Sequence, residues 1–342
     1  MKISVVICTF QGELYIQEQL ESILRQTRPV DEILLLDDGS KDQTVELARC
    51  LLEKSGIRWQ IIQNQKNVGV ARNFEQGIRK SQGDIVLTSD QDDVWTADKA
   101  EHFEKIFLEN PNCVLAFSDA KVTDSNLQVL RESLWDASGF GQKQQQLFRE
   151  QKYFSVLFSD NVVTGAAMGI RKRFAEMCIP APAGTLHDYW FALCAPAYGS
   201  ILAIAEKDLM YRQHGKNVVG IPGKGWTGKL KRWVHTVEIM QKDRTNRRIR
   251  AQMLYDYLNI LRTEKGDIEI TKAQLAVLIE DAKKWMDFSS WRDSLNEKSR
   301  INGISQILFH ALQGDYRRYV KKPGIVMQEI ASCFLHRNKE EA

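Results

Sequence analysis

The chain has 342 residues, of which 43% are hydrophobic and 27% charged, a composition typical of a globular protein with a sizeable core. Its net charge of +3 is unevenly distributed: residues 1–220 carry 24 Lys and Arg against 29 Asp and Glu, and residues 221–342 carry 23 against 15. The resulting net charges of −5 and +8 exclude one uniform surface and predict two regions, 1–220 and 221–342, with different electrostatic partners.

The spacing of the cysteines and the length of the apolar runs predict the cellular compartment of the protein. Six cysteines without close pairs or zinc-type spacing predict reduced, mostly buried thiols in a cytoplasmic protein: Cys8, Cys50, Cys113, Cys178, Cys194 and Cys333. Gln11, Glu13 and Glu18 interrupt the N-terminus, so we expect no signal peptide. Residues 189–205 are uncharged but fall short of the roughly 20 apolar residues that a spanning helix needs, which predicts a buried element.

Strand and helix patterns alternate along the first region. The strands are expected at residues 3–8, 32–36, 57–63, 84–89 and 113–117, and the helices at 14–28, 45–52, 70–81 and 97–109. Ser40 and Gln43 have capping-box spacing before the second helix, and Thr96 is the expected N-cap of the fourth. This alternation predicts an α/β fold with a mostly parallel sheet and helices on both of its faces.

The pattern changes beyond these elements. Residues 119–160 are less regular, and the glutamine-rich segment Gln142–Gln146 is expected to be a surface loop. Residues 161–171 have the small residues of a strand-like segment that a ligand could approach closely. From about residue 223 onward, we expect long helices without strands.

Polar loops follow four of the predicted strands. They are Thr9–Gln11, Asp37–Ser40, residues 67–73 and Asp90–Asp93. Because ligands bind at the carboxyl ends of the strands in such sheets, these loops should line one rim.

The strand at residues 84–89 ends in three carboxylates within four positions, Asp90, Asp92 and Asp93. Like charges repel at such spacing, and a divalent cation can compensate them. One interpretation is an Asp-x-Asp metal site, built from Asp90 and Asp92, that holds a nucleotide diphosphate. The alternative is an acidic loop in which one Asp caps the following helix.

Two more positions on this rim have two interpretations each. Asp38 before Gly39 suits a turn, and its carboxylate can also accept a hydrogen bond from the N3–H of a pyrimidine base, with Thr9 as a second contact to the nucleoside. Arg72 is either a solvated helix residue or a guanidinium that neutralises a pyrophosphate.

Two later segments are further candidates. Asp188 lies beside Tyr189 and Trp190, which would partly desolvate its carboxylate and raise its pKa toward that of a useful base, or it is an early acidic residue of a helix. His214, in a loop bounded by glycine, is either a packed or surface histidine or a metal ligand.

Together these segments resemble family 2 glycosyltransferases, which have the GT-A fold. The resemblance covers roughly residues 1–220 and rests on Ser4–Phe10, Asp37–Ser40, Ser89–Trp95, His187–Trp190 and Tyr211–Gly215. The Asp-Gln-Asp-Asp-x-Trp form with the later Tyr-Arg-Gln-His-Gly resembles the bacterial rhamnosyltransferase-like branch, which builds cell-surface polysaccharides.

The resemblance implies roles for individual residues. It implies nucleotide-sugar contacts at Thr9, Asp38, Arg72, Asp90 and Gln91. It implies a Mg²⁺ or Mn²⁺ site at Asp92, Asp90 and His214, with Asp93 behind it, and a general base at Asp188. Gln11 departs from the Asn of many relatives, and the Gln-x-x-Arg-Trp signature of processive synthases is absent near Gln213, which favours the addition of one sugar per encounter.

The implied reaction is an inverting transfer of L-rhamnose from dTDP-β-L-rhamnose to a lipid-linked acceptor of cell-surface polysaccharide. A UDP-sugar donor is an alternative, and so is a catalytically silent scaffold, which the joint presence of Asp90, Asp92 and Asp188 disfavours. A nucleotidyltransferase would need a glycine-rich phosphate loop near the N-terminus, which Thr9–Gly12 does not supply.

The basic second region is interpreted as a membrane contact, peripheral at the inner face of the plasma membrane. Alternatives are a helical subdomain with solvated faces or the contact of a homo-oligomer. Nucleic-acid binding is disfavoured because the donor site is acidic and no recognised module is present. The residues concerned are Trp226, Lys229, Lys231, Arg232, Trp233, Arg244, Arg247, Arg248, Arg250, Trp285, Trp291, Arg317, Arg318, Lys321 and Lys322.

Overall fold

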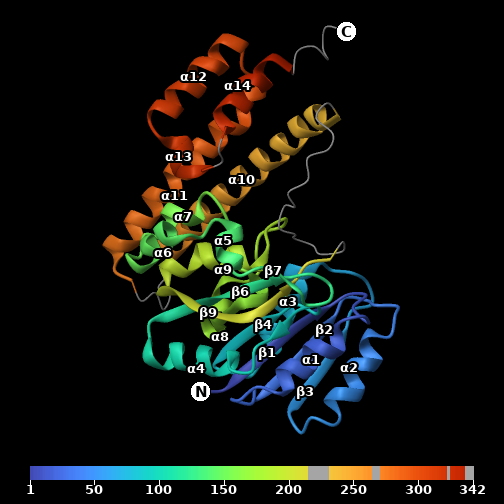
Figure 1. The fold of residues 1–342 in the computed structure, drawn as a ribbon. Helices are drawn as coiled ribbons and strands as arrows, with labels where there is room; N and C mark the ends of the chain where they lie inside the picture. The colour runs from blue at the N-terminus through green and yellow to red at the C-terminus, as the bar shows by residue number, and fades with distance from the viewer. Residues whose placement is uncertain (215–230, 264–269, 322–323, 336–342) are drawn as a thin grey trace. The chain divides into compact units, whose positions relative to one another are not determined.

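The computed structural model describes residues 1–214, 231–263, 270–321 and 324–335 (Figure 1). Outside the described residues lie Gly215, Trp226, Lys229 and Lys322 and the side chains of Lys231, Arg232 and Trp233. The chain divides into two compact units, the first formed by residues 1–153 and 162–222 and the second by residues 154–161 and 223–342.

A single sheet organises the first unit, with the strand order β3-β2-β1-β4-β8-β6-β9-β5 and with β7 paired to β6 (Figure 1). The strands are β1 Ile3–Thr9, β2 Glu32–Asp37, β3 Arg58–Gln63, β4 Ile85–Ser89, β5 Val94–Trp95, β6 Cys113–Thr123, β7 Val129–Arg131, β8 Met168–Arg171 and β9 Ser200–Arg212. The sheet is parallel from β3 through β4, and β8 then pairs antiparallel with both β4 and β6. The predicted strands are confirmed, and β6 continues six residues past its predicted end.

Helices cover both faces of this sheet, as predicted. They are α1 Ile16–Leu24, α2 Thr44–Leu52, α3 Val70–Lys80, α4 Lys99–Glu109, α5 Leu134–Ser138, α6 Gln142–Arg149, α8 Lys172–Cys178 and α9 His187–Cys194. Val5 and Ile7 of β1 belong to a core cluster with residues of α1, α2 and α4. Val6, which points the other way, meets α3 at Gly77, where a Cβ would lie 2.4 Å from Val6 Cγ1.

Three local predictions are wrong. Gln142–Gln146 is not a surface loop but the start of α6, because glutamine tolerates helices well and the buried ring of Phe148 anchors the helix among Phe117 and Phe140. The capping box at Ser40 does not form, since the Ser40 hydroxyl donates to Asp37 instead. Thr96 is not an N-cap, because α4 begins at Lys99 and Asp98 occupies that position.

The segment 161–171 is strand-like only at its end. β8 begins at Met168, after a short 3-10 turn at Gly165–Ala167. The uncharged stretch at residues 189–205 contains α9, whose residues are all buried, as predicted. The cysteines are free, and four of the six are buried.

The second unit is helical, as predicted. Its helices are α7 Phe154–Leu157, α10 Lys231–Thr263, α11 Lys272–Asp293, α12 Arg300–Leu312, α13 Asp315–Tyr319 and α14 Ile325–Leu335. Trp285 of α11 is completely buried and stacks on Phe158 at 4.5 Å between ring centroids. Among the described helices, none combines the length and the apolar character that would let it cross a membrane.

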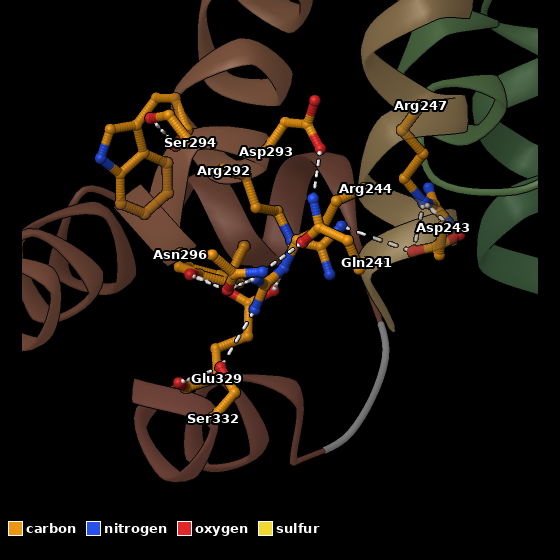
Figure 2. A network of polar contacts seen from close by, with 12 residues as sticks. Gln241, Asp243, Arg244, Arg247, Arg292, Asp293, Ser294, Asn296, Glu329 and Ser332 are labelled. Atoms are coloured by element: carbon orange, nitrogen blue, oxygen red, sulfur yellow. Dashed lines mark hydrogen bonds and ion pairs between the residues drawn. The ribbon is translucent and has the colours of Figure 1, made fainter. Parts of the chain in front are cut away.

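A buried polar network also ties this unit together. Figure 2 shows Arg244 of α10 and Arg292 of α11 converging on Glu329 of α14, at 3.3 Å and 2.6 Å. Glu329 is completely buried, and each arginine side chain is 2% exposed. The network joins α10, α11 and α14 through paired charges that would each be costly to bury alone.

Candidate active site

The predicted rim exists at the carboxyl ends of β1, β2 and β4. Parallel register places Thr9 opposite Asp37 and Ile7 opposite Ser89, so the loops that follow these strands begin at one level. The Asp38 backbone N–H donates to the Thr9 carbonyl at 2.8 Å, which locks the first two loops together. The sequence prediction that Thr9, Asp38 and Asp90 share a rim is therefore confirmed.

Asp37 and Asp38 hold the backbone of this rim. Asp37 accepts from the Thr9 hydroxyl at 2.9 Å and from the Ser40 backbone N–H at 2.9 Å. Asp38 accepts from the backbone N–H groups of Val68 and Gly69 at 2.8 and 2.9 Å. These bonds give both carboxylates the turn-stabilising role, and nucleoside contacts of Thr9 and Asp38 stay predictions.

Gln91 braces the first loop against the fourth. Its side-chain oxygen accepts from the Phe10 backbone N–H at 2.8 Å, and its side-chain nitrogen donates to the Phe10 carbonyl at 3.1 Å. The side chain thus fixes the spacing of the two loops. Its expected contact with the nucleotide sugar stays a prediction.

The ionised form of Asp90 is electrostatically unfavourable in the folded protein. Burial, together with the charges of Asp92 and Asp188, raises the pKa of Asp90 to about 7. Burial likewise raises the pKa of Asp93 well above its ordinary value, and Asp93 Oδ2 has no hydrogen-bond partner in the described part of the chain. The negative charge of the acidic loop, Asp90–Asp93, is therefore poorly compensated by positive groups of the protein itself.

His214 lies against the same loop. Its Nε2 is 2.7 Å from Asp92 Oδ2, and its ring stacks on Tyr15 with 5.0 Å between centroids. Two residues that the resemblance implies as metal ligands are thus brought together, 122 positions apart in the chain. A carboxylate and an imidazole beside carboxylates with uncompensated negative charge can bind a divalent cation such as Mg²⁺ or Mn²⁺.

Arg212, at the end of β9, is a residue whose role the sequence interpretation missed. Its backbone N–H donates to Asp93 Oδ1 at 2.9 Å, and its Nε donates to the Asp92 carbonyl at 2.7 Å. The guanidinium is 3% exposed and lies 4.7 Å from the Tyr15 ring centroid. Arg212 therefore places the β9 end, and with it His214, against the acidic loop.

Lys99 was also missed. It is completely buried at the start of α4, where its Nζ donates to the Ala166 carbonyl at 2.7 Å and lies 4.0 Å from the Trp95 ring centroid. Burial lowers the pKa of Lys99 to about 8, although the charges of Asp208, Asp93 and Asp90 favour the ammonium form. A lysine six residues after Asp93 was the sequence signal for this internal countercharge.

Asp188 occupies the first turn of α9, so the helix-start interpretation is confirmed. It is 8% exposed, and its Oδ2 accepts from the Gly165 backbone N–H at 3.0 Å. A Cβ at Gly165 would lie 3.1 Å from the His187 ring and 3.4 Å from Asp188 Oδ2, so glycine permits this approach. Since the charge of Asp188 contributes to the raised pKa of Asp90, the two carboxylates are electrostatic neighbours.

Arg72 faces solvent on α3. Its side chain is 44% exposed and pairs with Glu75 at 2.7 Å, which agrees with the interpretation as a surface helix residue. Its expected contact with a diphosphate stays a prediction.

Among the described residues, a second cluster of possible metal ligands does not include Asp92 or His214 and consists of Asp98, His102 and Asp208. One ligand atom from each of these three residues lies within 4.8 Å of the other two. Its two carboxylates face different ring nitrogens, with Asp208 Oδ1 2.7 Å from Nδ1 and Asp98 Oδ2 3.6 Å from Nε2. Burial disfavours the charged ring, but the hydrogen bond with Asp208 raises the pKa of His102 above its ordinary value. This geometry is that of a histidine bridging two carboxylates.

Comparison with solved structures defines the fold class. The crystal structure of S. aureus TarS 1-349 in complex with UDP-GlcNAc matches with a TM-score of 0.55 and 14% sequence identity, over 100% of this chain and 92% of that chain. The predicted GT-A fold is confirmed.

The sequence matches the family described as Glycosyl transferase family 2 over residues 4–177, just over half of the chain. The chain therefore belongs to this family, as the resemblance predicted. Its membership of the rhamnosyltransferase-like branch stays a prediction.

Curated relatives agree with the family. An uncharacterized glycosyltransferase of Nostoc sp. is 26% identical over 223 residues, which are 64% of this chain and 66% of that protein. A cholesterol galactosyltransferase of Borreliella burgdorferi is 34% identical over 94 residues, 27% of this chain and 25% of that protein. The matched regions cover less than two thirds of these relatives' own lengths.

Proposed function

We propose that this protein is an inverting, metal-dependent glycosyltransferase that moves one sugar from a nucleotide sugar to an acceptor hydroxyl. The observation that carries the proposal is the convergence of carboxylates from separate chain segments, Asp90 and Asp92 after β4 and Asp188 in α9, with His214 after β9. Family membership gives this acidic cluster its chemical context.

In the proposed reaction, Asp188 removes the proton of the acceptor hydroxyl, whose oxygen attacks the anomeric carbon from the face opposite the nucleotide. The hydrogen bond from Gly165 to Asp188 Oδ2 orients the carboxylate. Asp92, Asp90 and His214 would hold Mg²⁺ or Mn²⁺, which supplies positive charge to the departing diphosphate. Arg212 keeps these groups in register through Asp93 and the Asp92 carbonyl.

For the donor, we propose dTDP-β-L-rhamnose, with an α-L-rhamnoside as the product. The support is the Asp-Gln-Asp-Asp-x-Trp segment at residues 90–95 together with Tyr-Arg-Gln-His-Gly at 211–215. A UDP-sugar is the second candidate, favoured by the shared fold of TarS, whose crystal structure contains UDP-GlcNAc. We further propose a lipid-linked polysaccharide intermediate as the acceptor, met by residues 1–220 at the inner face of the plasma membrane, with residues 221–342 as the attachment region.

Ligand-induced thermal stabilisation tests the proposal. The protein is heated with dTDP, dTDP-rhamnose, UDP, UDP-GlcNAc or GDP, each with Mn²⁺ and with EDTA. A ligand at 100 times its Kd stabilises by about 2.7 kcal/mol, so binding should give a clear, metal-dependent shift. We expect the largest shift with dTDP-rhamnose; a shift selective for UDP ligands keeps the transferase and changes the sugar.

A matched pair of variants tests the metal site. Asp92→Asn should lose the metal-dependent part of the shift and the transferase activity, whereas Asp136→Asn, at an exposed position of α5, should keep both. Unchanged transfer by Asp92→Asn would remove the metal assignment. The absence of a shift with every nucleotide would contradict the proposed function itself.

A further inference from the structure

One helix of the second unit exposes an unusually apolar side. α12 buries Gly303 and Ile307, and its opposite side carries four large hydrophobic residues that are 84%, 47%, 57% and 88% exposed: Ile301, Leu308, Phe309 and Leu312. Ile301, Leu308 and Leu312 are spaced by seven and four residues, so they lie on one helical face. An amphipathic helix would normally place polar side chains there.

α14 packs against the buried side of α12, since a Cβ at Gly303 would lie 3.3 Å from Cys333 Sγ. The exposed side of α12 therefore faces away from α14. We call Ile301, Leu308, Phe309 and Leu312 the α12 apolar surface. Single exposed hydrophobic residues are common, but a concentration of this kind marks an interaction site.

The charged residues of α12, α13 and the start of α14 are almost all basic. Between residues 298 and 328 the only acidic residue is Asp315, which is hydrogen-bonded to His310 at 2.6 Å. The basic residues of this segment are Lys298, Arg300, Arg317, Arg318, Lys321 and Lys322. Glu329 of α14 is completely buried and so does not offset them at the surface.

Three of the arginines of α10 that the sequence interpretation also assigned to a membrane contact are paired within the unit instead. Arg244 is buried against Glu329 (Figure 2), Arg247 pairs with Asp243 at 3.1 Å, and Arg248 pairs with Asp293 at 2.6 Å. Their charges are balanced locally. Residues 298–328, with six basic residues against one acidic residue, contribute +5 to the net charge of +8 of residues 221–342.

We propose that the α12 apolar surface binds an anionic lipid bilayer, with its hydrophobic side chains at the level of the headgroups and acyl chains, and with Arg317 and Arg318 on the anionic headgroups. This inference deepens the proposed lipid-linked acceptor and rests on that part of the proposed function. A second copy of the chain fits less well, because a two-fold interface would bring the same basic residues of both copies together.

Vesicle sedimentation with the full chain tests this inference. The vesicles contain either phosphatidylcholine alone or equal parts of phosphatidylcholine and phosphatidylglycerol. We expect binding to the anionic vesicles, weaker binding at high salt and little binding to neutral vesicles. The double variant Ile301→Ser, Leu312→Ser should lower the partition coefficient about tenfold or more, as should Arg317→Gln with Arg318→Gln, since each basic residue near the surface contributes about 1 kcal/mol.

The matched control is the double variant Ile260→Ser, Val277→Ser, whose side chains are 51% and 62% exposed on α10 and α11. It removes two exposed apolar groups from other helices and should bind like the wild type. Equal binding by the Ile301/Leu312 variant, or no binding by the wild type, would overturn the inference. A concentration-dependent dimer that this variant dissociates would show that a second copy covers the surface instead.

Nucleotide-induced thermal shifts, measured on the same samples, separate this inference from the proposed function. A metal-dependent shift without vesicle binding would overturn only the membrane contact. Vesicle binding without any nucleotide shift would contradict only the transferase. Circular dichroism melting curves confirm that each variant is folded before its binding is compared.

Discussion

Replacing Asp90 with Asn should make the metal-free protein more stable at neutral pH. Its carboxyl has a pKa of about 7 in the folded protein against an ordinary value of 3.8, chiefly because it is buried and secondarily because Asp92 and Asp188 repel it. Each pKa unit corresponds to about 1.4 kcal/mol, so ionising Asp90 costs the folded state about 4 kcal/mol. Asn keeps the shape of the side chain and removes this cost.

The sign of the pH dependence follows from the two pKa values. Between pH 3.8 and 7 the folded state holds a proton that the unfolded state has lost, so the stability contributed by this group falls as the pH rises through this window. We therefore expect Asp90→Asn to gain up to about 4 kcal/mol over the wild type at pH 8, a much smaller gain at pH 5, and loss of transfer activity.

The assay is urea unfolding in EDTA at pH 5 and pH 8, followed by circular dichroism. Glu109→Gln, which removes an exposed carboxylate at the end of α4, is the control and should change little at either pH. Adding Mn²⁺ should stabilise the wild type more than Asp90→Asn. If Asp90→Asn is no more stable than the wild type at pH 8 in EDTA, the Asp90 carboxylate carries no such cost and the reasoning fails.

Three further substitutions test other parts of the structure. Asp188→Asn should lower kcat at least about a hundredfold while the Kd of the donor, measured by calorimetry, changes less than twofold; comparable turnover would exclude Asp188 as the base. Arg212→Gln should destabilise by about 2 kcal/mol in urea unfolding and weaken Mn²⁺ binding, because the carbonyls of Asp92 and Ser125 lose their guanidinium donor; unaltered Mn²⁺ affinity would contradict its positioning role. Glu329→Gln should cost about 3–5 kcal/mol, since it leaves Arg244 buried without a countercharge and Arg292 with Asp243 alone at 3.5 Å, and a near-neutral result in thermal melting would refute this view of the network.

The rim of the sheet was predictable because it follows from local pattern. Apolar runs identified β1, β2 and β4, and parallel pairing then required Thr9, Asp38 and Asp90 to lie at one edge. Asp188 and His214 could be assigned only through the resemblance, since nothing in their spacing brings α9 and the end of β9 to that edge. Their placement depends on pairing across the mixed half of the sheet.

Lys99 and Arg212 were missed because their partners are distant in sequence. Lys99 donates to the carbonyl of Ala166, and Arg212 donates to Glu18, 194 residues earlier. Buried cations are rare, so composition favours solvent for both. The same holds for α6, where the glutamines indicated a loop and the buried ring of Phe148 decided the outcome.

The carboxylates of the rim differ in how they are compensated, and this difference separates structural from functional acids. Asp37 and Asp38 each accept hydrogen bonds from two backbone N–H groups, which stabilise a buried charge without a cation. Asp90 and Asp93 have raised pKa values that the single ammonium of Lys99 does not offset. A divalent cation beside Asp92 would relieve this cost, so metal binding should stabilise the acidic loop far more than the loops held by Asp37 and Asp38, a contrast that amide hydrogen exchange with and without Mn²⁺ can measure.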